Sequence, residues 1–516
     1  MAVTEPAPAA PTVVHEGILR RQSLRESAAR TYARSLPVVP VRARGLTIEA
    51  ADGRRYLDCL SGAGALALGH NHPVVLEAIR KVLDSGAPLH VPDLATPVQD
   101  AFTTELFATL PRRFAENARV RFCGPAATDA VEAAVELVRT ATGRDGLLAF
   151  TGAHHGTTAG ALAASGAAQD VRVTRLPYPY DYRCPFGVGG ERGAELAARW
   201  TENLLADADA DPDDLDGGVP PFAGMILEPV QGEGGVIPAP DTWLRRMRAL
   251  TADRSIPLIA DEIETGVGRT GTFWAVEHSG IVPDVMVLSK AIGGSLPLAA
   301  IVYDSDLESR PPGDRTDTFR GNQLAMAAGA ATLAYVRRNK LADRAALLGA
   351  RMLGRLQGLA ASHHCVGDVR GRGLMIGVEL VAPAAGDPAP PAPEPGPVRP
   401  VFVGPERPAR HLAALSELPE YIQYTGNPPP CDAPHRTPRA DPRRPTGQDL
   451  AAAVQRECLS RGLIVGLGGR RSAVVRLLPP LTLTDEQAGA VVDRFADALA
   501  AAERAALRRS EAGLSH

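Results

Sequence analysis

Between about residues 74 and 303, short apolar runs alternate with longer helix-like segments. The runs lie at 118–122, 146–150, 223–230, 256–263 and 284–289, and each ends in small or polar residues. This alternation is typical of strand–helix–strand units, in which a mainly parallel sheet lies between layers of helices. The sequence therefore predicts an α/β fold. Because ligands bind at the carboxyl ends of such strands, the residues directly after each run are candidates for a functional site.

The flanking segments predict further elements. Residues 46–59 are expected to form two strands around the turn Asp52–Gly53. After Phe319 the pattern predicts two long helices at 324–339 and 341–359 and a strand at 374–380. A helix, two strands and a last helix are then expected at 450–459, 463–469, 473–478 and from 485 onward. These elements indicate a second, smaller domain.

The same patterns give domain boundaries. We expect a disordered, Ala- and Pro-rich N-terminus at 1–14 and a large sheet domain at 73–317. The smaller domain combines an N-terminal part at 15–72 with the segments 318–381 and 448–510. Residues 382–447 hold 18 of the 45 prolines in 66 positions, so this insertion is expected to be disordered or extended.

Composition narrows the class of protein. The 516 residues include 55 Lys and Arg against 59 Asp and Glu, and the net charge of −4 is spread without long runs of one sign, which argues against a nucleic-acid surface. The six cysteines lie far apart, with no CxxC pair and no histidine at zinc spacing, which fits reduced thiols in a cytosol. The sequence shows neither a secretory signal pattern nor a membrane-spanning run. We therefore expect a soluble, cytoplasmic protein.

The turn GPAAT at 124–128 connects a strand to a helix. Backbone N–H groups at such a helix start, together with the Thr128 hydroxyl, suit a phosphate group. A simple N-cap formed by Thr128 or Asp129 explains the same residues equally well.

Three acids, Asp261, Glu262 and Glu264, follow a very apolar run. Carboxylates at a buried strand end require a cation, a metal or a protonated ring as partner. A hard-metal site is one interpretation, although no further oxygen ligand is evident nearby. The other interpretation is that Asp261 faces a pyridinium nitrogen.

Lys290 interrupts the apolar run VMVLSKAIGG. A lysine at this place can be an ordinary strand-end residue that reaches solvent, or a desolvated nucleophile that attacks carbonyl groups. Its strand should end at the same sheet edge as Asp261 and the 124–128 turn. A phosphate-binding turn, a ring-facing acid and a strand-end lysine are together what pyridoxal phosphate (PLP) requires.

Longer motifs around these positions resemble the class III aminotransferases of PLP fold type I, and within them most closely the diaminobutyrate–2-oxoglutarate transaminases. The motifs are YLDCLSGAGALALGHNHP, ILEPVQGEGGV, LIADEIETGVGRTG, LSKAIGGSLPLA, TFRGNQLAMAAG and VRGRGLMIGVE. The likeness covers Leu36 to Glu379 and resumes at Asp449. It implies a large domain with a mainly parallel seven-stranded sheet between helices, and a smaller α+β domain built from N- and C-terminal segments.

The resemblance assigns roles to particular residues. The Schiff-base lysine of the family falls on Lys290, and the acid that keeps the pyridinium nitrogen protonated falls on Asp261. Phosphate contacts fall on Ala127 and Thr128. A further phosphate contact falls on Thr318, which the neighbouring subunit supplies in this family, so the resemblance implies a homodimer.

Three further positions face the cofactor in the family. Ile263 falls where an aliphatic side chain packs on one ring face, and His154 falls where an aromatic residue normally covers the other. Glu264 falls where a glutamine commonly holds the phenolic oxygen of the cofactor. Because His154 and Glu264 depart from the family pattern, we expect shifted cofactor affinity and pH profile. The histidines of GHNHP lack matching ligands, so we expect no metal.

Glu233 and Arg476 match a pair that relatives acting on terminal amines use, in which the arginine is released to hold the carboxylate of 2-oxoglutarate. An ordinary inter-domain salt bridge is the alternative. The implied reaction is reversible, ping-pong transfer of the terminal amine of L-2,4-diaminobutyrate to 2-oxoglutarate, giving aspartate 4-semialdehyde and glutamate. In the biosynthetic direction glutamate donates the amine and diaminobutyrate forms, which would supply siderophore, peptide-antibiotic or osmolyte pathways such as that of ectoine.

Three rival functions remain open from the sequence. The donor can instead be ornithine, 4-aminobutyrate or a polyamine, or the enzyme can be a PLP racemase or aminomutase. The chain can also be a degenerate homologue that binds partners through its proline-rich insertion.

The segment GLGGRRS at 466–472 resembles a phosphate loop, but no helix follows it, so we interpret it as a hairpin turn.

Overall fold

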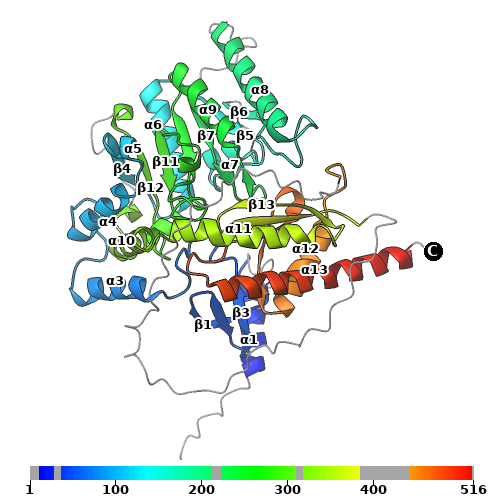
Figure 1. Cartoon of the computed structure of the whole chain (residues 1–516). Coiled ribbons are helices and arrows are strands. Elements are labelled where there is room, and N and C mark those ends of the chain that lie inside the picture. Colours follow the sequence, from blue (N-terminus) through cyan, green and yellow to red (C-terminus); the bar gives the residue numbers. More distant parts are fainter. Residues whose placement is uncertain are drawn as a thin grey trace, which may run out of the picture.

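A computed structural model describes residues 11–27, 36–168, 170, 172–210, 222–308, 318–383 and 441–513. Its largest sheet has seven strands in the order β4-β12-β11-β10-β7-β5-β6 (Figure 1). These strands are β4 (Ala118–Phe122), β5 (Gly146–Phe150), β6 (Val173–Leu176), β7 (Phe222–Leu227), β10 (Leu258–Asp261), β11 (Val285–Leu288) and β12 (Ala300–Asp304). Strand β12 pairs antiparallel with both β11 and β4, whereas the other pairs in this sheet are parallel. The predicted α/β fold with a mainly parallel seven-stranded sheet is confirmed.

Helices cover both faces of this sheet, and its central strands are therefore buried on both sides. Every residue of β7, β10 and β11 is buried. Along β10, Leu258 and Ala260 join one hydrophobic cluster and Ile259 joins another, as the two-residue period of a strand requires. Val131 and Val138 place α6 on the second face, whereas Trp243 places α9 on the first.

The helices of this part are α3 (Pro73–Asp84), α4 (Pro97–Phe107), α5 (Arg112–Ala115), α6 (Ala127–Thr142), α7 (Ala159–Ser165), α8 (Gly190–Ala210) and α9 (Asp241–Asp253). A small ribbon is formed by β8 (Val230–Gln231) and β9 (Ile237–Pro238). Short 3-10 turns are η1 (Ala275–His278), η2 (Lys290–Gly293), η3 (Ser305–Leu307) and η4 (Thr318–Arg320). Among the described residues, no helix is long and apolar enough to cross a membrane.

The N- and C-terminal segments lie together beside the large sheet (Figure 1). One small sheet joins β1 (Pro40–Arg44), β2 (Thr47–Ala50) and β3 (Arg55–Asp58) to β15 (Leu463–Ile464), and another joins β13 (Val366–Arg372), β14 (Met375–Leu380), β17 (Val474–Leu477) and β16 (Gly466–Gly468). Their helices are α10 (Gln323–Arg338), α11 (Leu341–Leu359), α12 (Gln448–Ser460) and α13 (Asp485–Gly513). Parallel pairing of Leu463 with Leu57 joins the two ends of the chain.

Two expected boundaries need correction. Helix α1 (Pro11–Arg25) begins inside the segment expected to be disordered, with proline at its first position, where a missing N–H costs nothing. Residues 441–447 of the proline-rich insertion are also placed, and Ala382 N donates to Pro445 O at 2.9 Å. The remaining residues of both segments, 1–10 and 384–440, lie outside the described part of the chain.

Two predicted turns are confirmed. Asp52–Gly53 connects β2 to β3, which pair antiparallel. GLGGRRS forms β16 and the 3-10 turn η5 (Arg470–Ser472), which connects to β17 in an antiparallel hairpin.

Candidate active site

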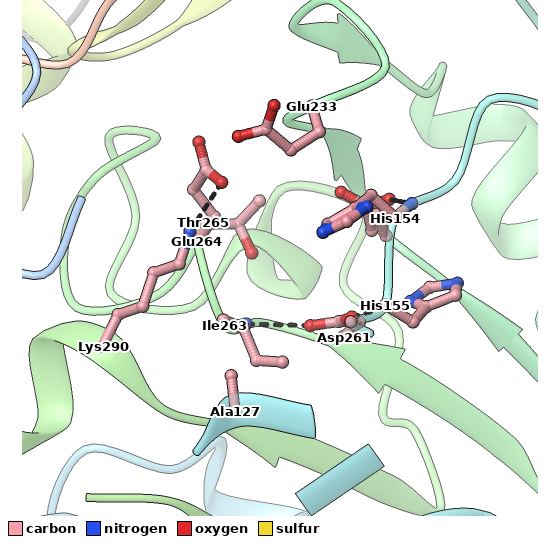
Figure 2. Close-up of a pocket in the computed structure, with 11 residues that line it drawn as sticks. Ala127, His154, His155, Glu233, Asp261, Ile263, Glu264, Thr265 and Lys290 are labelled. Carbon is pink, nitrogen blue, oxygen red and sulfur yellow. Dashed lines mark hydrogen bonds and ion pairs between the residues drawn. The ribbon is translucent and has the colours of Figure 1, made fainter. Parts of the chain in front are cut away.

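A pocket opens where β10 and β11 end and α6 begins, the sheet edge that the sequence indicated (Figure 2). Its lining residues come from segments far apart in the chain: Ala127, His154, His155, Gly156, Glu228, Glu233, Asp261, Ile263, Glu264, Thr265 and Lys290. The structure thus brings together seven of the predicted site residues: Ala127, His154, Glu233, Asp261, Ile263, Glu264 and Lys290.

Lys290 lies directly after β11 and begins the turn η2. Its backbone has φ +50°, a left-handed conformation that is uncommon outside glycine. Its Nζ donates to Glu264 Oε2 at 2.8 Å (Figure 2). Burial alone would raise the pKa of Glu264, but Lys290 and Arg476 beside it lower that pKa below its usual value. Glu264 is therefore an ionised acceptor and cannot donate a hydrogen bond from its carboxyl group.

Arg476 lies on β17, is 3% exposed and contacts two of the acids that line the pocket. Its Nη1 donates to Glu233 and its Nη2 donates to Glu264, both at close range. The predicted pairing of Glu233 with Arg476 is therefore present, and Glu264 adds a second carboxylate that the sequence did not indicate. The guanidinium of Arg476 is closed on both sides by acids of the chain itself.

Asp261 ends β10 and is buried against His155. Its Oδ2 lies 2.7 Å from His155 Nδ1, and its Oδ1 accepts from Ile263 N at 3.1 Å. Burial lowers the pKa of His155, but the bond and the charge of Asp261 outweigh burial and raise it overall. His155 Nε2 is buried without a hydrogen-bond partner in the described residues. His155 had no predicted role. Its place before Gly156 in the motif GAHHGTT was the only sequence feature that could have indicated one.

The other acids of this region have different surroundings. Glu228 accepts from His154 N and Gly232 N, both at 2.9 Å, and burial raises its pKa to about 7. Glu262 points away to Thr265 and to Val276 N, and burial raises its pKa to about 7 as well. The metal interpretation of three convergent acids therefore has no geometric support, because Glu262 does not line the pocket.

The start of α6 fits a phosphate group. Ala126 occupies the N-cap and provides no side-chain cap, so the first N–H groups of the helix stay uncovered. Asp129 instead accepts from Ala126 N at 3.0 Å. A methyl group at Gly156, whose φ is +128°, would lie 2.6 Å from Thr128 Oγ1, so only glycine allows this close approach of the two segments.

Thr128, Thr318 and Arg476 are not among the described residues that line the pocket. The Thr128 hydroxyl lies 2.7 Å from Thr158 Oγ1, and the Thr158 hydroxyl in turn donates to Glu132. Thr318 lies on the segment before α10, where its carbonyl accepts from His90 Nε2 at 2.7 Å.

Comparisons with known proteins identify the family of this chain. Residues 28–396 match the family Aminotransferase class-III. The fold is that of PLP-dependent transaminases: an amine transaminase from an uncultivated Pseudomonas species, solved in its PLP-bound form, superposes with a TM-score of 0.71 at 27% identity over 90% of this chain and 95% of that one. The chain belongs to the class III aminotransferases and is a PLP-dependent enzyme.

Two similar curated proteins share one description. The diaminobutyrate–2-oxoglutarate aminotransferase of Rhizobium meliloti (strain 1021) is 46% identical over 94% of this chain and 92% of its own length. The protein of the same description from Haemophilus influenzae (strain ATCC 51907 / DSM 11121 / KW20 / Rd) is 38% identical over 93% and 94%.

Proposed function

We propose that this enzyme transfers the terminal amine of L-2,4-diaminobutyrate to 2-oxoglutarate, giving aspartate 4-semialdehyde and glutamate in a reversible, ping-pong reaction. The observation that carries the proposal is the bond between Arg476 and Glu233, an acid that lines the pocket of Lys290. A closed arginine disfavours a carboxylate beside the reacting carbon, as suits a terminal amine, whereas opening of Glu233 would admit 2-oxoglutarate. The shared description of the relatives at 46% and 38% identity supports the same substrates.

The residues of the pocket fit PLP. We assign the first N–H groups of α6, at Ala127 and Thr128, to its phosphate and Asp261 to its ring nitrogen. Ile263 and His154 would face the ring, and Lys290 would hold its aldehyde carbon. When bound, PLP supplies an electron sink for charge that develops on the substrate carbon.

The chain itself supplies the proton transfers. We assign Lys290 Nζ as the base that takes the proton from the carbon bearing the amine and later returns it as an acid. Glu264, ionised and 2.8 Å away, would receive and orient the lysine ammonium in the stages when Lys290 is free. His155 Nδ1, 2.7 Å from Asp261 Oδ2, fixes the Asp261 carboxylate in position.

A donor screen tests the substrate assignment. Purified enzyme is given 2-oxoglutarate with diaminobutyrate, ornithine, 4-aminobutyrate or putrescine, and glutamate is measured. Ornithine differs from diaminobutyrate by one methylene, a difference usually worth about 10- to 200-fold in kcat/KM. We expect diaminobutyrate to exceed each other donor by about tenfold or more; a higher kcat/KM for another donor would reassign the enzyme.

We further propose a homodimer in which Thr318 serves the site of the neighbouring subunit. Leu89, Leu94 and Phe319 are exposed, and the segments that carry them are joined by Val91 N and Gly321 O. We expect sedimentation to give twice the 54.2 kDa mass of one chain. We also expect Thr318→Val to lower PLP affinity; a fully active monomer would contradict the proposal.

We also place the enzyme in the cytoplasm, as the sequence led us to expect. Cysteines Cys59, Cys123, Cys184, Cys365 and Cys458 are free thiols in the described part of the chain, which supports a reducing compartment.

A further inference from the structure

A second pocket adjoins the first and shares His154 and Glu233 with it. Its other lining residues are Thr151, Gly152, Ala153, Tyr178, Tyr180, Arg183, Pro185, Gln231, Gly234, Ile237, Gly469 and Arg470. The two pockets therefore meet at His154 and Glu233, and the second pocket is the candidate place for the other end of a substrate whose amine reaches Lys290.

The second pocket has two cationic residues in its described lining, and only one has a free charge. The Arg183 guanidinium donates to Glu379 and, through Nη1, to Pro442 O at 2.7 Å. The Arg470 guanidinium has neither a hydrogen bond nor an ion pair with any residue that the structure describes. An arginine without a partner at a pocket wall is a ready site for a carboxylate, which its planar fork can bind through two hydrogen bonds.

Arg470 is positioned beside Glu233 by the backbone. It follows Gly469, whose N–H donates to Glu233 O at 2.8 Å, and it begins η5 in the hairpin that leads to Arg476. The Glu233 side chain is 40% exposed, and of its two carboxylate oxygens Oε1 accepts from Arg476. One free cation and one half-engaged carboxylate thus lie on adjoining segments of the same wall.

We propose that Arg470 and Glu233 form the site for the amino-acid head of the donor, with the α-carboxylate on Arg470 and the α-ammonium on the outer oxygen of Glu233. This inference rests on the proposed function and names the residues that select its substrate. The arrangement complements an α-amino acid zwitterion and leaves the terminal amine free to reach Lys290. A diamine without a carboxylate gains nothing from Arg470.

The test compares two donors that differ only in the carboxylate, because 1,3-diaminopropane is diaminobutyrate without that group. We expect Arg470→Gln to raise the KM for diaminobutyrate by about tenfold or more, the loss typical of a charged hydrogen bond, with little change in kcat. The diamine that lacks the carboxylate should keep its wild-type KM in this variant. Measurement of the donor half-reaction without 2-oxoglutarate keeps the acceptor out of the comparison, and the same loss should appear there as a higher half-saturating donor concentration.

Two variants sharpen the result. Arg471→Gln removes the neighbouring exposed arginine, which lines a different pocket with Asp449 and Arg509, and should leave the KM unchanged for both donors. Arg470→Lys keeps the charge and should recover part of the affinity for diaminobutyrate. An unchanged KM for diaminobutyrate in Arg470→Gln, or an equal loss with both donors, would overturn the inference. Failure of the wild-type enzyme to use diaminobutyrate would instead contradict the proposed function.

Discussion

Glu264 is the single side chain that most sets the state of the pocket. Its ionised carboxylate accepts a hydrogen bond from Lys290 Nζ and another from Arg476. In Glu264→Gln the lysine loses this bond to a charged acceptor and is freer to bind the cofactor, and the new amide can donate a hydrogen bond to the cofactor. We therefore expect PLP to bind about tenfold more tightly, as measured by titration of the apoenzyme.

Glu233→Gln is the matched control for that titration. It also removes a carboxylate from Arg476 but leaves the contact between Lys290 and Glu264 intact, so the PLP affinity should change little. Weaker PLP binding in Glu264→Gln would contradict the interpretation that the bond from Lys290 to Glu264 opposes PLP binding.

At the same scale, the sequence identified residues whose position follows from a strand end. Lys290 and Asp261 each follow an apolar run, so their presence at one sheet edge could be predicted. His155 was missed because its partner Asp261 lies 106 positions away and no local pattern marks the contact. The bond between Glu264 and Arg476 was missed for the same reason, since it spans 212 positions.

At the scale of elements, helix α10 fixes the turn η2 that begins with Lys290. A methyl group at Gly329 of α10 would overlap the carbonyl oxygen of Ile292 in η2. Gly329→Ala should therefore displace η2, destabilise the protein by roughly 1–3 kcal/mol and lower kcat, although position 329 does not line the pocket. The thermal midpoint and turnover check both effects.

A glycine in the neighbouring helix provides the control. A methyl group at Gly354 of α11 would meet no atom within 4 Å, so Gly354→Ala should stabilise the protein by about 0.5–1 kcal/mol through helix propensity alone. If Gly329→Ala behaved like Gly354→Ala, the close packing of α10 on η2 would not position the lysine.

Element order was predictable where hydrophobic runs are long and uniform. The five runs noted in the large sheet correspond to β4, β5, β7, β10 and β11. Strands β6 and β12 were not predicted, and β12 is the strand that runs antiparallel between β11 and β4. Only the 3-10 turn η2 and a short loop separate it from β11, so the expected alternation of strands with α-helices fails there.

For the whole molecule, buried acids make stability depend on pH. The pKa of Glu262 is about 7 in the folded chain against 4.5 for the ordinary group, because burial disfavours its charge. Below pH 4.5 both states hold the proton. Between pH 4.5 and 7 only the unfolded chain releases it, so stability falls as pH rises, by roughly 3 kcal/mol in all.

Glu262→Gln isolates this contribution, because an amide can replace the protonated acid against Thr265 and Val276 N. We expect the variant to have a higher thermal midpoint than the wild type at pH 8 and a smaller difference at pH 4.5. Equal pH dependence in the two proteins would exclude Glu262 as a source of the decline.

The most direct measurement is the amount of glutamate formed from diaminobutyrate and 2-oxoglutarate, with Lys290→Ala as the matched variant. We expect the wild-type enzyme to form glutamate and aspartate 4-semialdehyde in equal amounts and Lys290→Ala to form neither. Glutamate formation by Lys290→Ala at the wild-type rate, or none by the PLP-loaded wild-type enzyme, would contradict it.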